Sequence, residues 1–152
     1  MASIRPAFVA DALAMGPNMR EIDKREAELL TGKAPVEALI NQVSISQKAW
    51  TGMAEGQIVC MFGVSKPGVL SPDVMPWLAG TDLILKHSRE FLRRNKEFLP
   101  VMLEGARTAY GMVLAENTAA ITWLRWLGFA VHKKAPVTYQ GATLYKFEMK
   151  VR

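Results

Sequence analysis

The sequence predicts a single α/β domain that spans residues 1–152. Half of the residues are apolar, and a chain of this length can bury a core without disulfides. Segments with alternating apolar residues, typical of strands, are interspersed with segments whose apolar residues recur every three or four positions, typical of helices. No repeat or long polar tract interrupts this pattern, so we expect the chain to fold throughout.

The first third of the chain is predicted to start as a short strand and continue as helices. Residues 3–7 form the strand, and residues 11–30 carry apolar residues at helical spacing. The segment Gly16-Pro17-Asn18 should divide this stretch into two helices. A further short helix is expected over residues 36–41, with Pro35 in its first turn.

The next segment is predicted to form an antiparallel hairpin. Residues 43–50 alternate well enough for the first strand, residues 51–56 resemble a turn, and residues 57–64 form the second strand. Residues 65–76 contain three prolines and a glycine and are expected to be a long loop. A short strand then follows over residues 77–81.

One long amphipathic helix is predicted from Asp82 to Leu103. Its apolar residues step by threes and fours, and most of its charged residues lie elsewhere on the helical wheel. Pro100 should kink or divide this helix, because proline removes an internal hydrogen bond.

The last third should hold a short helix between strands. Asn117 supplies an N-cap for a helix that Gly128 stops. The flanking strands are expected at three places: residues 110–115, 129–132 and 143–151. The loop through Pro136 and Gly141 is expected to connect the last two.

Composition limits the classes of protein that fit. Cys60 is the only cysteine, which excludes a disulfide framework and leaves too few thiolates for a structural zinc site. It lies in an apolar run and should be buried and unreactive. No apolar stretch reaches the length of a membrane span, and the first residues do not resemble a signal peptide. The net charge of +5 favours acidic partners in general.

The segment from Asn117 to Phe129 resembles the C-terminal motif of the GNAT superfamily of N-acyltransferases. The asparagine, Ala120 and the Gly128-Phe129 pair all fall in register with that motif, and Ile4-Arg5-Pro6 is similar to the first strand of the family. The order of predicted elements also agrees along the whole chain. The resemblance implies a central mixed, mostly antiparallel sheet with helices on both faces.

The resemblance also implies a site for acetyl-CoA or CoA between strands 77–81 and 110–115. The backbone of Leu78, Ala79 and Gly80 and the side chain of Asn117 would contact the cofactor. Its pyrophosphate would lie at the start of the long helix, where free amides and the helix dipole favour an anion. The basic, glycine-rich loop that the family usually has there is replaced by residues 82–89, which contain no glycine. The side chains that could still contact the pyrophosphate are Lys86, His87, Ser88 and Arg89.

Catalytic residues are harder to assign. Many family members have a tyrosine seven residues after the motif asparagine as the proton donor, and this chain has Leu124 there. Tyr110 and Tyr139 are the alternatives for that role. Three residues are candidates for the general base: Asp82, Glu116 and His87.

These departures, with the small size of the chain, resemble a GNAT-like branch in T7-type bacteriophages that is called an internal virion protein. This resemblance implies a degenerate acyltransferase scaffold used in virion morphogenesis or in binding a host protein, located in the phage virion or the host cytoplasm. Exposed aromatic residues would contact a protein partner, with Trp77, Trp123 and Trp126 as candidates. An active acetyl-CoA-dependent N-acetyltransferase that acts on an amine is the alternative, and a homodimer is open to either.

A nucleic-acid-binding protein ranks last. The long helix carries five basic residues: Lys86, Arg89, Arg93, Arg94 and Lys96. Glu90 and Glu97 interrupt this patch in the sequence, and no base-reading motif accompanies it.

Overall fold

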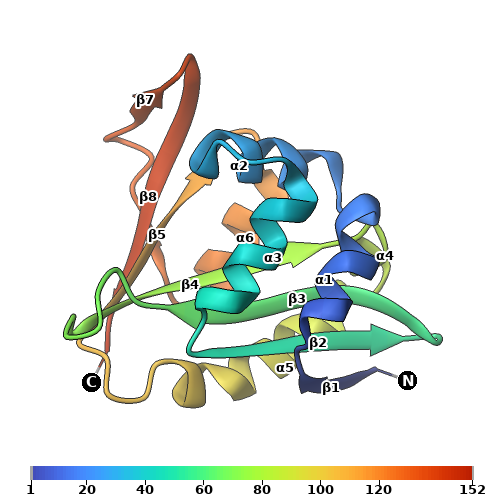
Figure 1. The fold of residues 1–152 in the computed structure, drawn as a ribbon. Coiled ribbons are helices and arrows are strands. Elements are labelled where there is room, and N and C mark those ends of the chain that lie inside the picture. Colours follow the sequence, from blue (N-terminus) through green and yellow to red (C-terminus); the bar gives the residue numbers. More distant parts are fainter. Residues whose placement is uncertain (1, 152) are drawn as a thin grey trace.

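The computed structural model describes residues 2–151, which form a sheet with helices on both faces (Figure 1). The strands are β1 (Ser3–Pro6), β2 (Lys48–Ala54), β3 (Gln57–Ser65), β4 (Asp73–Gly80), β5 (Thr108–Leu114), β6 (Ala130–Val131), β7 (Val137–Tyr139) and β8 (Ala142–Lys150). The helices are α1 (Val9–Met15), the short 3₁₀ helix η1 (Gly16–Asn18), α2 (Glu21–Thr31), α3 (Pro35–Ile45), α4 (Leu83–Lys86), α5 (Ser88–Met102) and α6 (Thr118–Leu127).

The sheet is mixed and mostly antiparallel, as predicted. Its strand order is β1-β2-β3-β4-β5-β8-β6, and β7 pairs with β8 outside this path. Only the contact between β4 and β5, at the centre of the sheet, is parallel. The central strands β3, β4 and β5 therefore determine which groups face one another in the middle of the molecule.

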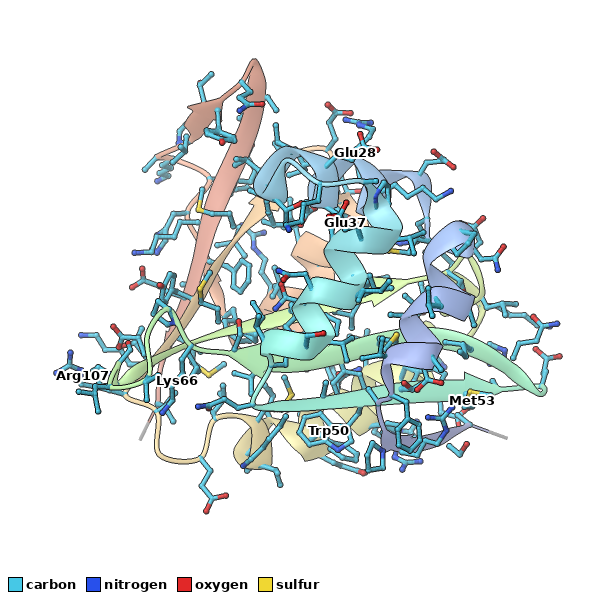
Figure 2. The ribbon with its side chains drawn as sticks, in the orientation of Figure 1. Glu28, Glu37, Trp50, Met53, Lys66 and Arg107 are labelled. Atoms are coloured by element: carbon cyan, nitrogen blue, oxygen red, sulfur yellow. The ribbon has the colours of Figure 1, made fainter. Side chains whose placement is uncertain are left out.

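Two apolar clusters cover the two faces of the sheet. On one face, Phe91 of α5 packs with Phe62 of β3, and Trp50 of β2 stacks on the same Phe62 ring at 5.6 Å between centroids. On the other face, Met15 of α1 and Leu39 of α3 pack on Met61 of β3. Because neighbouring residues of a strand point to opposite faces, Met61 and Phe62 serve different clusters. The figures show α1, α2 and α3 together on one side, with the exposed side chains of Glu28 and Glu37 directed away from the sheet (Figure 2).

Several predicted elements are confirmed. The opening strand, the break at Gly16-Pro17-Asn18 and the antiparallel β2–β3 hairpin are all present. Asn117 caps α6 by accepting a hydrogen bond from the Ala120 backbone N–H, and Gly128 ends the helix in the left-handed conformation. Cys60 is buried in the core, where burial raises the pKa of its thiol to about 12.

The hairpin begins later than predicted. Residues 43–45 belong to α3, so the prediction of a strand from residue 43 was wrong. Val43 packs beside Leu39 on the α1–α3 cluster at helical spacing, and this tertiary contact prevails over the local alternation. The turn of the hairpin is also shorter than predicted, because β2 extends to Ala54 and only Glu55-Gly56 have positive φ.

The predicted loop over residues 65–76 is shorter than expected as well. β4 starts at Asp73 and contains Pro76, so the prediction of a loop there was wrong for residues 73–76. Proline normally indicates a break in a strand, which explains this error. The small strand β7 was missed for a similar reason, since it lies in the predicted loop through Pro136.

The predicted long helix is two helices, and the break is at His87 rather than Pro100. His87 has φ −108° and ψ 15°, which ends α4 and precedes α5. Its imidazole Nε2 lies 2.9 Å from Glu55 Oε2 in the β2–β3 turn. Pro100 lies in the last turn of α5, which continues to Met102. A proline there removes one hydrogen bond near the end of the helix without dividing it.

Candidate functional site

The central feature of the candidate site is a gap between β4 and β5. The two parallel strands pair at Asp73 with Thr108 and at Val74 with Ala109, and their pairing goes no further. Both strands nevertheless continue, β4 to Gly80 and β5 to Leu114. The two strands therefore diverge like the arms of a V, at the place where the sequence resemblance implied a cofactor site.

Pro76 gives a physical reason for this divergence. The Thr81 N–H donates to Val59 of β3, so odd-numbered residues of β4 direct their backbone groups toward β3 and even-numbered residues direct theirs toward β5. Pro76 is the next residue on the β5 side after Val74, and it has no N–H to donate. The ladder between β4 and β5 loses a donor at the residue where it ends.

A cleft of about 350 Å³ occupies the gap. On one face of the sheet it is bounded by residues of α5 and α6, such as Phe91 and Leu124, and on the other face by residues of α2 and α3, such as Glu26 and Gln42. Most of its lining is apolar, including Phe62 of β3. Residues from elements on both faces of the sheet thus line the same cleft.

Glu26 of α2 is a carboxylate of the cleft that has no basic partner of its own. Its Oε2 accepts hydrogen bonds from Asn117 Nδ2 at 3.1 Å and from the Leu114 backbone N–H at 3.4 Å. Among residues 2–151, no donor lies within hydrogen-bond distance of Oε1. Burial raises the pKa of Glu26 to about 7, and nearby Asp23 adds to this increase, whereas the hydrogen bond from Asn117 opposes it. Glu26 can therefore exchange a proton near neutral pH.

Asn117 holds this arrangement in one orientation. Its Oδ1 accepts from the Ala120 N–H at 3.3 Å and from Arg20 Nη2 at 3.4 Å. With Oδ1 engaged in this way, the amide nitrogen is directed to Glu26. The motif asparagine thus combines the role of a helix cap with that of a partner for a carboxylate in the cleft.

A buried ion pair lies beside Glu26 and Asn117. Arg20 donates to both oxygens of Asp23, from Nε at 3.0 Å and from Nη2 at 2.9 Å. The Arg20 guanidinium also lies 5.3 Å from the centre of the Trp123 ring. Asp23 Oδ2 accepts from the Gly80 N–H at 2.9 Å, and the Arg20 N–H donates to the Gly80 carbonyl at 2.8 Å. This pair therefore links the end of β4 to the start of α6.

The backbone groups of Leu78, Ala79 and Gly80, which were predicted to contact the cofactor, face in different directions. Leu78 lines the cleft and its backbone groups face β5 by the alternation described above. Ala79 faces β3, and both backbone groups of Gly80 are already bonded to Arg20 and Asp23. Among the three, Leu78 is the residue whose backbone is best placed for a ligand in the cleft.

The predicted pyrophosphate contacts lie at the junction of α4 and α5. Ser88 lines the cleft, whereas Lys86 and His87 both contact the Glu55 carboxylate, at 3.3 Å and 2.9 Å. Arg89 is exposed and has no ion-pair partner among the described residues. The basic groups are close to one end of the cleft, and two of them already have an anionic neighbour.

The candidate acids and bases from the sequence do not line the cleft. Glu116 pairs with Arg25 at 3.0 Å, Asp82 is exposed next to α4, and His87 bonds to Glu55. Tyr139 is exposed on β7, and Tyr110 has Lys146 over its ring. Leu124 does line the cleft, so the position of the usual tyrosine is present without its hydroxyl.

Sequence reasoning missed Arg20, Asp23 and Glu26. Asp23 and Glu26 lie in a helix rich in charge and Arg20 directly precedes it, so each one resembles a solvated surface residue. An arginine and an aspartate three apart at the start of α2 are a weak signal of an ion pair, but nothing local indicates that the pair is buried.

Comparison with known proteins gives a clear result for the fold alone. No protein-family model matches the chain, and no curated protein matches it significantly. Among solved structures, yncA from Salmonella typhimurium with its cofactor acetyl-CoA has a TM-score of 0.70 at 15% identity, covering 99% of this chain and 94% of that one. The acetyltransferase of GNAT family from Streptococcus pneumoniae has a TM-score of 0.66 at 15% identity, with 100% of both chains covered.

A third similar structure is spermidine N-acetyltransferase from Vibrio cholerae in complex with CoA and spermine. Its TM-score is 0.66 at 11% identity, and the match covers 98% of this chain and 95% of that one. The chain therefore has the GNAT acyl-CoA N-acyltransferase fold, which confirms the fold predicted from the sequence. The comparisons do not show the relation to a phage branch of this fold that the sequence resemblance implied.

Two further observations concern the kind of protein. Within residues 2–151, no helix is long and apolar enough to cross a membrane. The same residues contain no group of three or more histidine, cysteine, aspartate or glutamate side chains that could hold a metal ion.

Proposed function

We propose that this protein binds an acyl-CoA in the cleft between β4 and β5 and transfers the acyl group to an amine. The observation that carries the proposal is the cleft itself, whose lining includes Ser88 at the start of α5 on one face of the sheet and Glu26 of α2 on the other. A thioester and an amine can then meet from opposite faces of the sheet. This division of access suits a reaction between two substrates.

The residues of the cleft would act on the amine and on the carbonyl oxygen. Glu26 Oε1 accepts the proton of the attacking amine as the C–N bond forms, because its pKa near 7 suits a general base. The Leu78 N–H, which faces the cleft, donates to the oxygen on which negative charge develops. An acyl-CoA supplies the activated carbonyl, and its C–S bond breaks as the thiol leaves. Since Leu124 offers no proton to the sulfur, water must supply it.

The first experiment is a calorimetric titration of acetyl-CoA into the purified protein. We expect micromolar binding in the wild type and in Glu26→Gln, and transfer to amines in the wild type alone. A Leu78→Pro variant removes the proposed N–H donor and should slow transfer, whereas Leu78→Ala keeps that N–H and controls for loss of the side chain. Absence of both heat and thermal stabilisation at millimolar acetyl-CoA would rule out this function.

A second candidate is a non-catalytic scaffold in a phage virion or a protein that binds a host protein in the cytoplasm. Its support is the bonding of Gly80 to Asp23 and Arg20, together with Leu124 in place of the tyrosine. Both features remove groups that an acyl-CoA would use. Mass spectrometry of purified phage particles tests this role. The role also requires that the protein does not bind acetyl-CoA. A copy number below one per particle would argue against it.

A further inference from the structure

The basic residues of α5 lie on two different faces of the helix. At 3.6 residues per turn, Arg89, Arg93 and Lys96 fall within about 60° of one another. Glu90 and Glu97 lie roughly 80° to 100° from Arg89 and roughly 40° to 60° from Arg93 around the same axis. The two glutamates therefore border the basic stripe on its Arg93 side, and their own partners determine whether they neutralise it.

Each glutamate also has a partner outside the basic stripe. Glu90 Oε1 accepts a hydrogen bond from the Ala2 N–H at 3.2 Å, next to β1. Glu97 Oε2 lies 3.6 Å from Arg94 Nε on its own side of the helix. Arg89 and Arg93 are exposed, and neither has an ion-pair partner among residues 2–151. The stripe thus keeps its positive charge.

The stripe continues onto the neighbouring helix α6 through an aromatic side chain. Lys96 Nζ lies 4.6 Å from the centre of the Trp126 ring, and Trp126 is 48% exposed. Arg125 precedes Trp126 and is exposed as well, without a partner among the described residues. We call the set of Arg89, Arg93, Lys96, Arg125 and Trp126 the α5–α6 basic surface.

We propose that the α5–α6 basic surface binds single-stranded nucleic acid, a function beyond acyl transfer. Cations that recur along about 10 Å of one helix face suit a ligand whose negative charges also recur along a line. An exposed tryptophan at the end of the cations provides a surface on which a base can stack, and stacking requires an unpaired strand. A protein partner would need a broad patch with an apolar centre, whereas this surface has one aromatic residue among four cations.

Fluorescence anisotropy with a labelled oligo-dT strand of about 20 nucleotides tests this proposal in the full chain. We expect binding at about 50 mM salt whose affinity falls as salt rises, with a slope of about −2 to −3 for three to four phosphate contacts. Arg93→Glu should weaken binding about tenfold. Arg107→Glu is the matched control, because it makes the same charge change at an exposed arginine outside α5 and α6 that has no ion-pair partner among residues 2–151, and it should alter the affinity less than threefold. Trp126→Ala should weaken binding about fivefold with an unchanged salt slope.

Several outcomes would overturn the proposal. One is no binding at about 50 mM salt, and another is an equal loss of affinity in Arg93→Glu and Arg107→Glu. Tighter binding of a duplex of the same length would refute the preference for a single strand, and tighter binding of polyglutamate would indicate an acidic protein instead. Acetyl-CoA affinity, measured in the same Arg93→Glu protein, should be unchanged, which separates this surface from the cleft.

Discussion

The side chain of Asn117 donates a hydrogen bond of 3.1 Å to Glu26, a residue 91 positions away in the chain. The bond joins the start of α6 to the middle of α2 across the open end of the gap between β4 and β5. It gives a helix cap a second function, because the same amide determines which carboxylate oxygen remains available to the cleft. The predictions below begin from this pair.

Glu26→Gln should remove a pH dependence of stability. The pKa of Glu26 is raised in the folded protein, from 4.5 to about 7, so the folded state binds a proton more tightly than the unfolded state. The free energy of unfolding of the wild type should therefore decrease as the pH rises from about 4.5 to about 7, by on the order of 2 to 3 kcal/mol. Urea unfolding at pH 5 and pH 8 measures this difference. Glu28→Gln, an exposed change on the same helix, should keep the loss of stability between pH 5 and pH 8. If both variants removed this loss equally, the pH dependence would not belong to Glu26.

Asn117→Ala should destabilise the fold by about 2 to 4 kcal/mol. It removes the cap of α6 and takes one hydrogen bond each from Arg20 and Glu26. Thermal or urea unfolding gives the value. Asn18→Ala removes a side-chain hydrogen bond at an exposed position and should cost less than about 0.5 kcal/mol. A small loss in Asn117→Ala would show that the buried network contributes little.

Removal of the Arg20–Asp23 pair should be strongly non-additive. Arg20→Met or Asp23→Leu alone should each cost about 3 to 5 kcal/mol, since each leaves an unpaired buried charge. The double variant should cost far less than the sum, because both charges are then absent. A double-mutant cycle by urea unfolding measures the coupling. Additive losses would mean that the two residues act independently.

Leu124→Tyr tests the chemistry of the cleft. The leucine side chain lines the cleft at the position where many proteins of this fold have a tyrosine. We expect the tyrosine variant to transfer acetyl groups at least about tenfold faster than Leu124→Phe, which differs from it only by the hydroxyl group. Rates are measured by thiol release from acetyl-CoA. Equal rates in the two variants would show that proton donation to the sulfur is not limiting.

Features that depend on neighbouring residues could be predicted from the sequence. Asn117 and Gly128 act through bonds to residues within one helical turn, so their positions indicated the bounds of α6 correctly. The apolar run after the turn likewise agreed with β3, which is buried on both faces. The order of such local signals was enough to indicate the fold.

Features that depend on distant residues could not be predicted. Glu26 resembles a solvated charge until Leu114 and Asn117 are brought to it from 88 and 91 residues away. The break at His87 is accompanied by a contact with Glu55, which lies in a separate hairpin. Pro76 was misread because proline in a strand is rare, and only the strand order shows that it borders a gap. The residues of the site are therefore harder to predict from the sequence than the helices and strands that position them.

The gap beside Pro76 coincides with a missing backbone hydrogen atom, and most of the side chains that line the cleft have no part in that absence. Residues that line the cleft can change during evolution without restoring the lost donor, so a lineage can exchange one chemistry for another while the cavity persists. A related protein without acyltransferase activity would still keep the cleft between these two strands. That cleft is a place where a new ligand can be selected without the invention of a new fold.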